Sequence, residues 1–204
     1  VLNFSAACVI IIYGEVIIRG KSEYDYIKNI IRRNYFMCGI VGYIGQRDCT
    51  DVLMQGLEKL EYRGYDSAGI AVFEKTGIKT VKTKGKLADM RHKLDIEGSP
   101  VGHCGIGHTR WATHGEPSDI NSHPHTNGRV TIVHNGIIEN YIELKEFLTE
   151  KGYAFTSQTD TEVVACLLDY YYSERNPLRA ITETLKELLS LIHISEPTRP
   201  LYIS

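Results

Sequence analysis

Residues 69–83 read Gly-Ile-Ala-Val-Phe-Glu-Lys-Thr-Gly-Ile-Lys-Thr-Val-Lys-Thr. Two short runs rich in apolar and β-branched residues, 69–74 and 78–83, flank a turn-forming Lys-Thr-Gly sequence, which is the pattern of a β-hairpin. The two strands of a hairpin are antiparallel, whereas consecutive parallel strands need a long crossover connection. This segment therefore favours an antiparallel sheet.

The sequence around the hairpin predicts further strands and a group of helices. Apolar runs at 39–45 and 129–134 are typical of buried strands. Leucine and valine recur at helical spacing between residues 52 and 60. Strands that come in hairpins, with helices between them but no strict strand–helix alternation, favour an α+β fold in which helices cover antiparallel sheets.

Capping residues mark the expected starts of three later helices. Asn140 followed by Glu143 fits a capping box, and Gly152 suits the end of that helix. Thr159-Asp160 can cap a helix that runs to about residue 172. Asn176-Pro177 opens the last helix, for which one apolar face is expected, made of Leu178, Ile181, Leu185 and Leu188.

The composition describes an ordinary domain. The chain has 204 residues, a formal net charge of −2 and 43% hydrophobic residues, enough to form a core. It has no basic stripe for nucleic acid. Five widely spaced cysteines indicate a reducing compartment rather than a disulfide framework. The apolar stretch 6–18 is interrupted and too short to span a membrane. We therefore expect a cytoplasmic protein with neither a nucleic acid nor a membrane partner.

Both ends of the chain differ in character from the middle. The chain begins with Val1, and its first methionine is Met37. Residues 190–204 resemble a translated sequencing adapter. We therefore expect an upstream extension at 1–36, a single domain at 37–189 and an unrelated tail at 190–204.

Cys38, directly after Met37, has two interpretations. A small second residue allows removal of the initiator methionine, which would give Cys38 both a thiol and a free α-amine. An α-amine has a pKa near 8 and can take the thiol proton, so one residue supplies nucleophile and base. The alternative is an inert cysteine at the start of a core strand, which position alone favours.

Residues 107–115 form a second candidate, because they are dense in polar residues and lack a regular period. Arg110 can hold a carboxylate with two hydrogen bonds. Thr113 and His114 can add hydrogen bonds, and Trp111 can cover a small ligand. The alternative is a surface loop with one anchoring tryptophan.

Two more segments carry candidate groups. Asn135-Gly136 follows an expected strand and precedes an expected helix, and an amide with a backbone N–H can form an oxyanion hole. A tight hairpin turn is the alternative. Asp160 either caps a helix or binds a substrate ammonium group.

The histidines are clustered, but they match no familiar metal motif. The chain lacks CxxC, HExxH and paired HxxxH spacings, and it lacks a phosphate-binding glycine loop. We therefore predict no metal and no cofactor. The cluster consists of His103, His108, His114, His123, His125 and His134.

Five segments together resemble the N-terminal-nucleophile glutamine amidotransferases and, among them, the family of glutamine–fructose-6-phosphate aminotransferases. They are Met-Cys-Gly-Ile-Val-Gly-Tyr-Ile-Gly at 37–45, Leu-Glu-Tyr-Arg-Gly-Tyr-Asp-Ser-Ala-Gly-Ile at 60–70, Gly-His-Thr-Arg-Trp-Ala-Thr-His-Gly-Glu-Pro at 107–117, Asn-Ser-His-Pro-His at 121–125 and His-Asn-Gly-Ile-Ile-Glu-Asn-Tyr at 134–141. The resemblance covers residues 37 to about 187. It implies a four-layer αββα sandwich of antiparallel sheets.

The resemblance also implies a role for each matching residue. Cys38 is the nucleophile, and Asn135 with Gly136 forms the oxyanion hole. The resemblance places Arg110, Thr113 and His114 on the glutamine carboxylate and Asp160 on its ammonium group. It places Trp111 on a loop that closes over glutamine. Arg63 and His123 match positions with a supporting role.

The implied reaction releases ammonia from glutamine for the conversion of fructose 6-phosphate to glucosamine 6-phosphate, the first step of hexosamine synthesis. The family's sugar-phosphate isomerase modules and the last strands of its glutaminase domain lie outside this chain, and the complete enzymes are expected to be homo-oligomers. One alternative is another amidotransferase of the same class, such as amidophosphoribosyltransferase or asparagine synthetase, although residues 62–67 and 110–114 favour the aminotransferase. The other is an inactive fragment in which residues 1–36 block the Cys38 amine.

Overall fold

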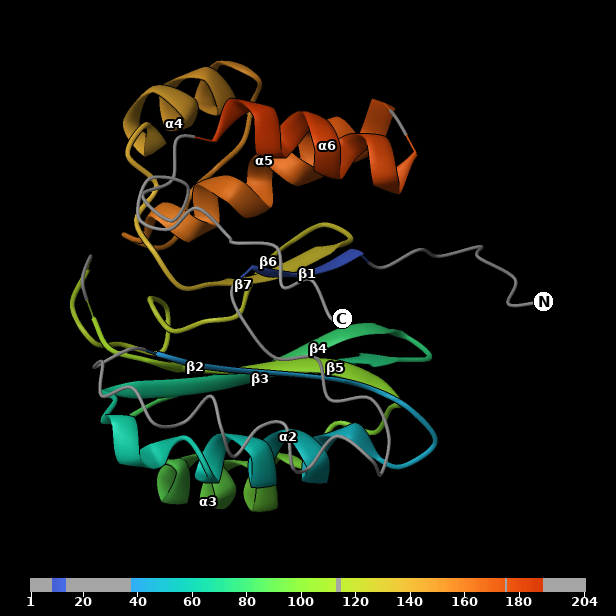
Figure 1. The fold of residues 1–204 in the computed structure, drawn as a ribbon, viewed down its shortest axis with the longest axis vertical. Helices are drawn as coiled ribbons and strands as arrows, with labels where there is room; N and C mark the ends of the chain where they lie inside the picture. The colour runs from blue at the N-terminus through green and yellow to red at the C-terminus, as the bar shows by residue number, and fades with distance from the viewer. Residues whose placement is uncertain (1–8, 14–37, 113–114, 175, 189–204) are drawn as a thin grey trace, which may run out of the picture.

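The computed structural model describes residues 9–13, 38–112, 115–174 and 176–188. Within them, two β-sheets lie face to face between two layers of helices, as Figure 1 shows. The order of layers is helix, sheet, sheet, helix. The α+β sandwich expected from the sequence is confirmed.

The larger sheet has four strands and is antiparallel throughout. Its order is β2-β5-β3-β4. The predicted hairpin forms its edge, because Glu74 of β3 pairs with Gly77 of β4 and leaves a two-residue turn. The strands are β2 (Gly39–Ile44), β3 (Ser67–Glu74), β4 (Gly77–Lys84) and β5 (Cys104–Arg110).

Helices α2 (Cys49–Glu58) and α3 (Leu87–Glu97) cover the outer face of this sheet (Figure 1). Asp48 accepts a hydrogen bond from the backbone N–H of Thr50 at 2.9 Å, which starts α2 earlier than the apolar spacing indicates. Leu53 and Leu57 of α2 are fully buried in one core cluster with Ile70 of β3. Burial of apolar side chains on one helix face is the main force that holds such a layer to a sheet.

The smaller sheet has the order β1-β7-β6. Strands β6 (His125–Asn127) and β7 (Val130–His134) are antiparallel, but β1 (Val9–Tyr13) pairs with β7 in parallel. The sequence predicts antiparallel pairs only, so β1 is a difference. Its Val-Ile-Ile-Ile-Tyr sequence has strong strand propensity, and pairing along all five residues satisfies backbone groups that an open β7 edge would expose.

Helices α4 (Tyr141–Glu150), α5 (Asp160–Glu174) and α6 (Pro177–Glu187) cover the outer face of the smaller sheet (Figure 1). Leu148 of α4 and Leu167 of α5 are buried in the same cluster as Ile132 of β7. No helix in the described ranges is long and apolar enough to cross a membrane.

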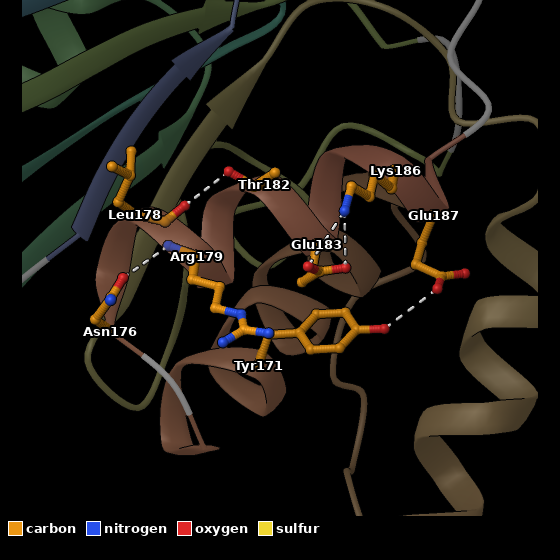
Figure 2. A network of polar contacts seen from close by, with 8 residues as sticks. All are labelled: Tyr171, Asn176, Leu178, Arg179, Thr182, Glu183, Lys186 and Glu187. Atoms are coloured by element: carbon orange, nitrogen blue, oxygen red, sulfur yellow. Dashed lines mark hydrogen bonds and ion pairs between the residues drawn. The ribbon is translucent and has the colours of Figure 1, made fainter.

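The helix starts confirm one capping prediction and overturn another. Asn176 accepts a hydrogen bond from the backbone N–H of Arg179 at 2.9 Å, as predicted (Figure 2). The capping box at Asn140 is wrong, because this side chain makes no capping bond and its Nδ2 donates to the carbonyl oxygen of Glu187 at 2.7 Å. Tyr171 donates to the Glu187 carboxylate at 3.3 Å (Figure 2), so the end of α6 contacts both α4 and α5.

The predicted apolar face of α6 is also partly wrong. Leu178 is 76% exposed, while Ala180 and Thr184 are buried. Small residues face α5 instead, because close packing of two helices leaves little room for a leucine at each contact. Ile181 and Leu188 do pack against the core from its rim.

Gly69 is a point of close contact between the larger sheet and the segment that leads into β6. A Cβ atom at this position of β3 would lie 2.0 Å from the backbone carbonyl oxygen of His123. A small apolar cluster fills the space next to this contact, formed by Ile40, Ala71, Ile106 and Val133 from strands of both sheets. The contact therefore sets the distance between the sheets beside the candidate site.

Gly69→Ala is expected to destabilise the fold by about 1–3 kcal/mol, because the added methyl must push the His123 backbone away. Urea unfolding monitored by circular dichroism measures this loss. Lys75→Ala, at an exposed position of the adjoining turn, is the control and should change the free energy of unfolding by less than about 0.5 kcal/mol. Equal stability of Gly69→Ala and the original chain would contradict the close contact.

Candidate active site

Cys38 lies directly before β2, and strand register brings it to the end of β5. Gly39 pairs with Thr109, and the Gly39 N–H donates to the Thr109 hydroxyl at 3.0 Å. The backbone N–H of Trp111 donates to Cys38 Sγ at 3.1 Å. The thiol is half-buried and faces the residues that follow β5.

The environment of this thiol keeps it protonated. Burial raises the pKa of Cys38 above its usual value, and the nearby Asp66 carboxylate raises it further. The Trp111 N–H and the Arg110 guanidinium oppose this by favouring the thiolate. Because the thiolate is the reactive form, the site needs a base close to Sγ.

Asn135 and Gly136 follow β7 in the other sheet, and the fold brings them to Cys38 across 97 positions of sequence. The Asn135 side-chain Nδ2 donates to the carbonyl oxygen of Cys38 at 2.8 Å. Asn135 Oδ1 lies 2.9 Å from His108 Nε2. Gly136 has a φ of +150°, a conformation that residues with a Cβ rarely adopt. The chain continues to α4, so these residues form no hairpin turn.

Arg110 and Asp160 place opposite charges at the same end of the sandwich. Arg110 ends β5, is 4% exposed and donates from Nη2 to the carbonyl oxygen of Gly115 at 3.2 Å. Burial lowers its pKa, while the negative charges of Asp66 and Asp160 act in the opposite direction. Asp160 begins α5 and accepts from the backbone N–H of Ile138 at 2.8 Å.

The other predicted site residues are placed less completely. Trp111 is 51% exposed and lies against Gly64. Arg63 ends the short 3-10 helix η1 (Glu61–Arg63), and its side chain lies outside the described part. Thr113 and His114 also lie outside the described residues.

Asp66 was missed by the sequence reasoning. Its carboxylate accepts hydrogen bonds from the Ala112 N–H and from the Ser67 hydroxyl. Its backbone N–H donates to the carbonyl oxygen of Arg110. Asp66 thereby holds the segment whose Trp111 N–H contacts Cys38. The residue lies within the Tyr-Asp-Ser motif at 65–67, but its position in the motif does not reveal these contacts.

Four buried histidines lie behind the site. The ring of His123 lies 4.4 Å from that of His108 and 4.8 Å from that of His125, measured between centroids. The backbone N–H of His134 donates to His123 Nδ1 at 3.5 Å. Burial lowers the pKa of all four, that of His108 to about 4, so the rings are neutral at pH 7. His123 thus contacts the other three histidines of this group.

No group of three or more histidine, cysteine or acidic side chains is arranged to hold a metal ion within the described ranges. The arrangement suits other chemistry: a thiol, an amide donor, a buried guanidinium and a carboxylate meet at one end of the sheets. Arginine and aspartate are complementary to the two charges of a free amino acid.

Known proteins share this arrangement of sequence and fold. Residues 79–174 match the model of the glutamine amidotransferase domain. The chain is 63% identical over 138 residues to glutamine–fructose-6-phosphate aminotransferase [isomerizing] of Clostridium tetani, covering 67% of this chain and 22% of the relative. The chain belongs to the glutamine amidotransferase family.

Other relatives agree with this family assignment. The aminotransferase of the same name from Clostridium perfringens is 60% identical over 154 residues, covering 74% of this chain and 25% of that protein. The glutamine phosphoribosylpyrophosphate amidotransferase of B. subtilis, solved with ADP and GMP, superimposes with a TM-score of 0.61 at 25% identity over 76% of this chain and 33% of that one. The chain spans about a quarter of the length of the two clostridial relatives.

The lowered pKa values of the buried histidines predict that the fold loses stability in acid. In the unfolded chain, histidine takes up a proton near pH 6.5, whereas His108 in the fold does so only near pH 4. The contribution of the neutral His108 to the free energy of unfolding is therefore complete above pH 7 and is lost as the pH drops from 6.5 to 4. At pH 5 the loss for His108 alone is about 2 kcal/mol. Urea unfolding at pH 7, 6 and 5 measures this.

A matched pair of variants tests which histidines are responsible. His125→Gln should weaken the pH dependence, because a buried histidine is removed while an amide remains to bond the Thr159 hydroxyl, now 2.9 Å from Nε2. His92→Gln changes an exposed histidine and should leave the dependence unchanged. An equal effect of the two would rule out the buried layer as the cause.

Proposed function

We propose that this domain hydrolyses the side-chain amide of glutamine, with Cys38 as nucleophile. The observation that carries the proposal is the meeting of three segments: the Cys38 thiol, the Asn135 amide on the Cys38 carbonyl, and the Arg110 guanidinium at the end of the adjacent strand. A nucleophile, an oxyanion donor and a carboxylate holder are the groups that amide hydrolysis of an amino acid requires.

In the proposed mechanism, Cys38 Sγ attacks the side-chain carbonyl carbon and its proton passes to the Cys38 α-amine. An Asn side chain has two N–H groups; one binds the Cys38 carbonyl and the second, with the Gly136 N–H, is assigned to the oxyanion. The C–N bond then breaks, and the α-amine returns the proton so that ammonia leaves. Water cleaves the thioester, which gives glutamate and restores the thiol.

The orientation of glutamine follows from the two charged residues. Arg110 holds the α-carboxylate and Asp160 the α-ammonium group, with Thr113 and His114 adding hydrogen bonds and Trp111 covering the bound substrate. Arg63 and His123 are assigned supporting roles. A protonated thiol in the free site fits this scheme, because the α-amine accepts its proton only as attack begins.

We further infer that the ammonia is used for glucosamine 6-phosphate synthesis from fructose 6-phosphate. The names of the two clostridial relatives, at 63% and 60% identity, support this over the phosphoribosylpyrophosphate amidotransferase at 25%. The proposal places the domain at residues 37–189 of a cytoplasmic homo-oligomer whose sugar-phosphate part lies outside this chain.

Cys38→Ala is expected to abolish release of glutamate from glutamine. The assay compares the intact chain with a form that starts at Met37, and mass spectrometry confirms removal of that methionine. Only the form with Cys38 at its start has the α-amine base, so it should be the faster of the two. Cys104→Ala, which changes a half-buried cysteine elsewhere, is the control. Turnover in Cys38→Ala would disprove the mechanism.

Arg110→Lys is expected to raise the KM for glutamine about tenfold, because lysine keeps the charge but loses the two-pronged grip on a carboxylate. The same variant should lose most of its preference for glutamine over 4-aminobutanamide, which lacks the α-carboxylate. An unchanged preference would remove Arg110 from the carboxylate site.

A further inference from the structure

His108 is a fully buried residue directly behind the site, and none of the proposed steps uses it. It belongs to β5, two residues before Arg110, and its side chain points between the sheets. Its Nε2 lies 2.9 Å from Asn135 Oδ1. The ring therefore contacts the side chain that is assigned to the oxyanion, on the side away from Cys38.

The direction of the Asn135 amide determines the protonation of this ring. The Cys38 carbonyl oxygen is only an acceptor, so the atom of Asn135 that faces it must be the N–H₂ group. The atom that faces His108 is then the amide oxygen, which is also an acceptor. His108 Nε2 must therefore carry a hydrogen and donate it to Asn135.

We propose that His108 is a positioning residue of the glutaminase site: its Nε2–H holds the Asn135 carboxamide with both N–H groups directed to the Cys38 side. This rests on the proposed function. An asparagine amide held at one end only can rotate, and an oxyanion donor is effective when it is oriented before the charge develops. The bonds at 2.8 and 2.9 Å hold the amide at both ends.

The surroundings of His108 suit this task. Its neighbour His123 packs against it with 4.4 Å between ring centroids, and His108 is 0% exposed, so the ring is enclosed by protein. Desolvation lowers its pKa to about 4, and the ring stays neutral where glutamine hydrolysis is measured. The hydrogen bond to Asn135 is therefore present across the neutral pH range.

Nitrogen NMR of the intact chain with labelled histidine and asparagine tests the protonation directly. The proposal requires a neutral His108 with the hydrogen on Nε2 at pH 7, and the nitrogen shifts distinguish this tautomer from the other one and from the cation. The Asn135 side-chain signals should be kept in His108→Gln, which retains an N–H donor, and shifted in His108→Met, which does not. A hydrogen on Nδ1 alone, or Asn135 signals unaffected by His108→Met, would overturn the proposal.

Kinetics separate positioning from a general loss of structure. His108→Met should lower kcat for glutamine about tenfold, as expected for the loss of one well-placed hydrogen bond, while KM changes less than about threefold. His108→Gln should recover most of the rate. Alkylation of Cys38 by iodoacetamide forms no oxyanion, so its rate should be the same in all three chains.

The outcomes distinguish this inference from the function on which it rests. Equal losses in turnover and alkylation, or no recovery in His108→Gln, would assign His108 a merely structural role. Turnover that persists in Cys38→Ala would instead refute the glutaminase mechanism. The tautomer measurement needs no turnover and decides the hydrogen bond in either case.

Discussion

The hydrogen bond from Asn135 Nδ2 to the Cys38 carbonyl joins the two sheets at the point where the site lies. Cys38 precedes a strand of the larger sheet and Asn135 follows a strand of the smaller one, so neither sheet contains a site by itself. The bond length of 2.8 Å requires that the sheets stack at a fixed distance, which the Gly69 contact with His123 sets. Packing between the sheets thus determines the geometry next to the thiol.

The interior next to the site is partly polar. Ile40, Ala71, Ile106 and Val133 form a small apolar cluster between the sheets. Buried histidines occupy the region behind the site. A buried polar ring costs free energy unless it finds a partner, and several of these rings contact Asn135, Thr159 or a backbone N–H. These neutral histidines support the site without adding a charge that would compete with Arg110 and Asp160.

Local signals in the sequence predicted most of the fold. The hairpin at 69–83, the strand after Cys38 and the cap at Asn176 depend on neighbouring residues, and the structure contains all three. The pairing of β1 with β7, the Asn140 bond to Glu187 and the His108 bond to Asn135 join distant segments, and no local pattern encodes them. For the site, motif resemblance indicated Cys38, Arg110 and Asn135, while Asp66 and His108 became visible only through their contacts.

Trp111 is the only tryptophan of the chain, and its backbone N–H contacts the Cys38 sulfur. Its ring is 51% exposed and lies against Gly64, so its emission is sensitive to anything that covers or displaces the ring. The thirteen tyrosines do not absorb at 295 nm as tryptophan does, so excitation there selects this one side chain. The molecule therefore carries its own optical probe beside the thiol, and events at Cys38 can be followed without a label.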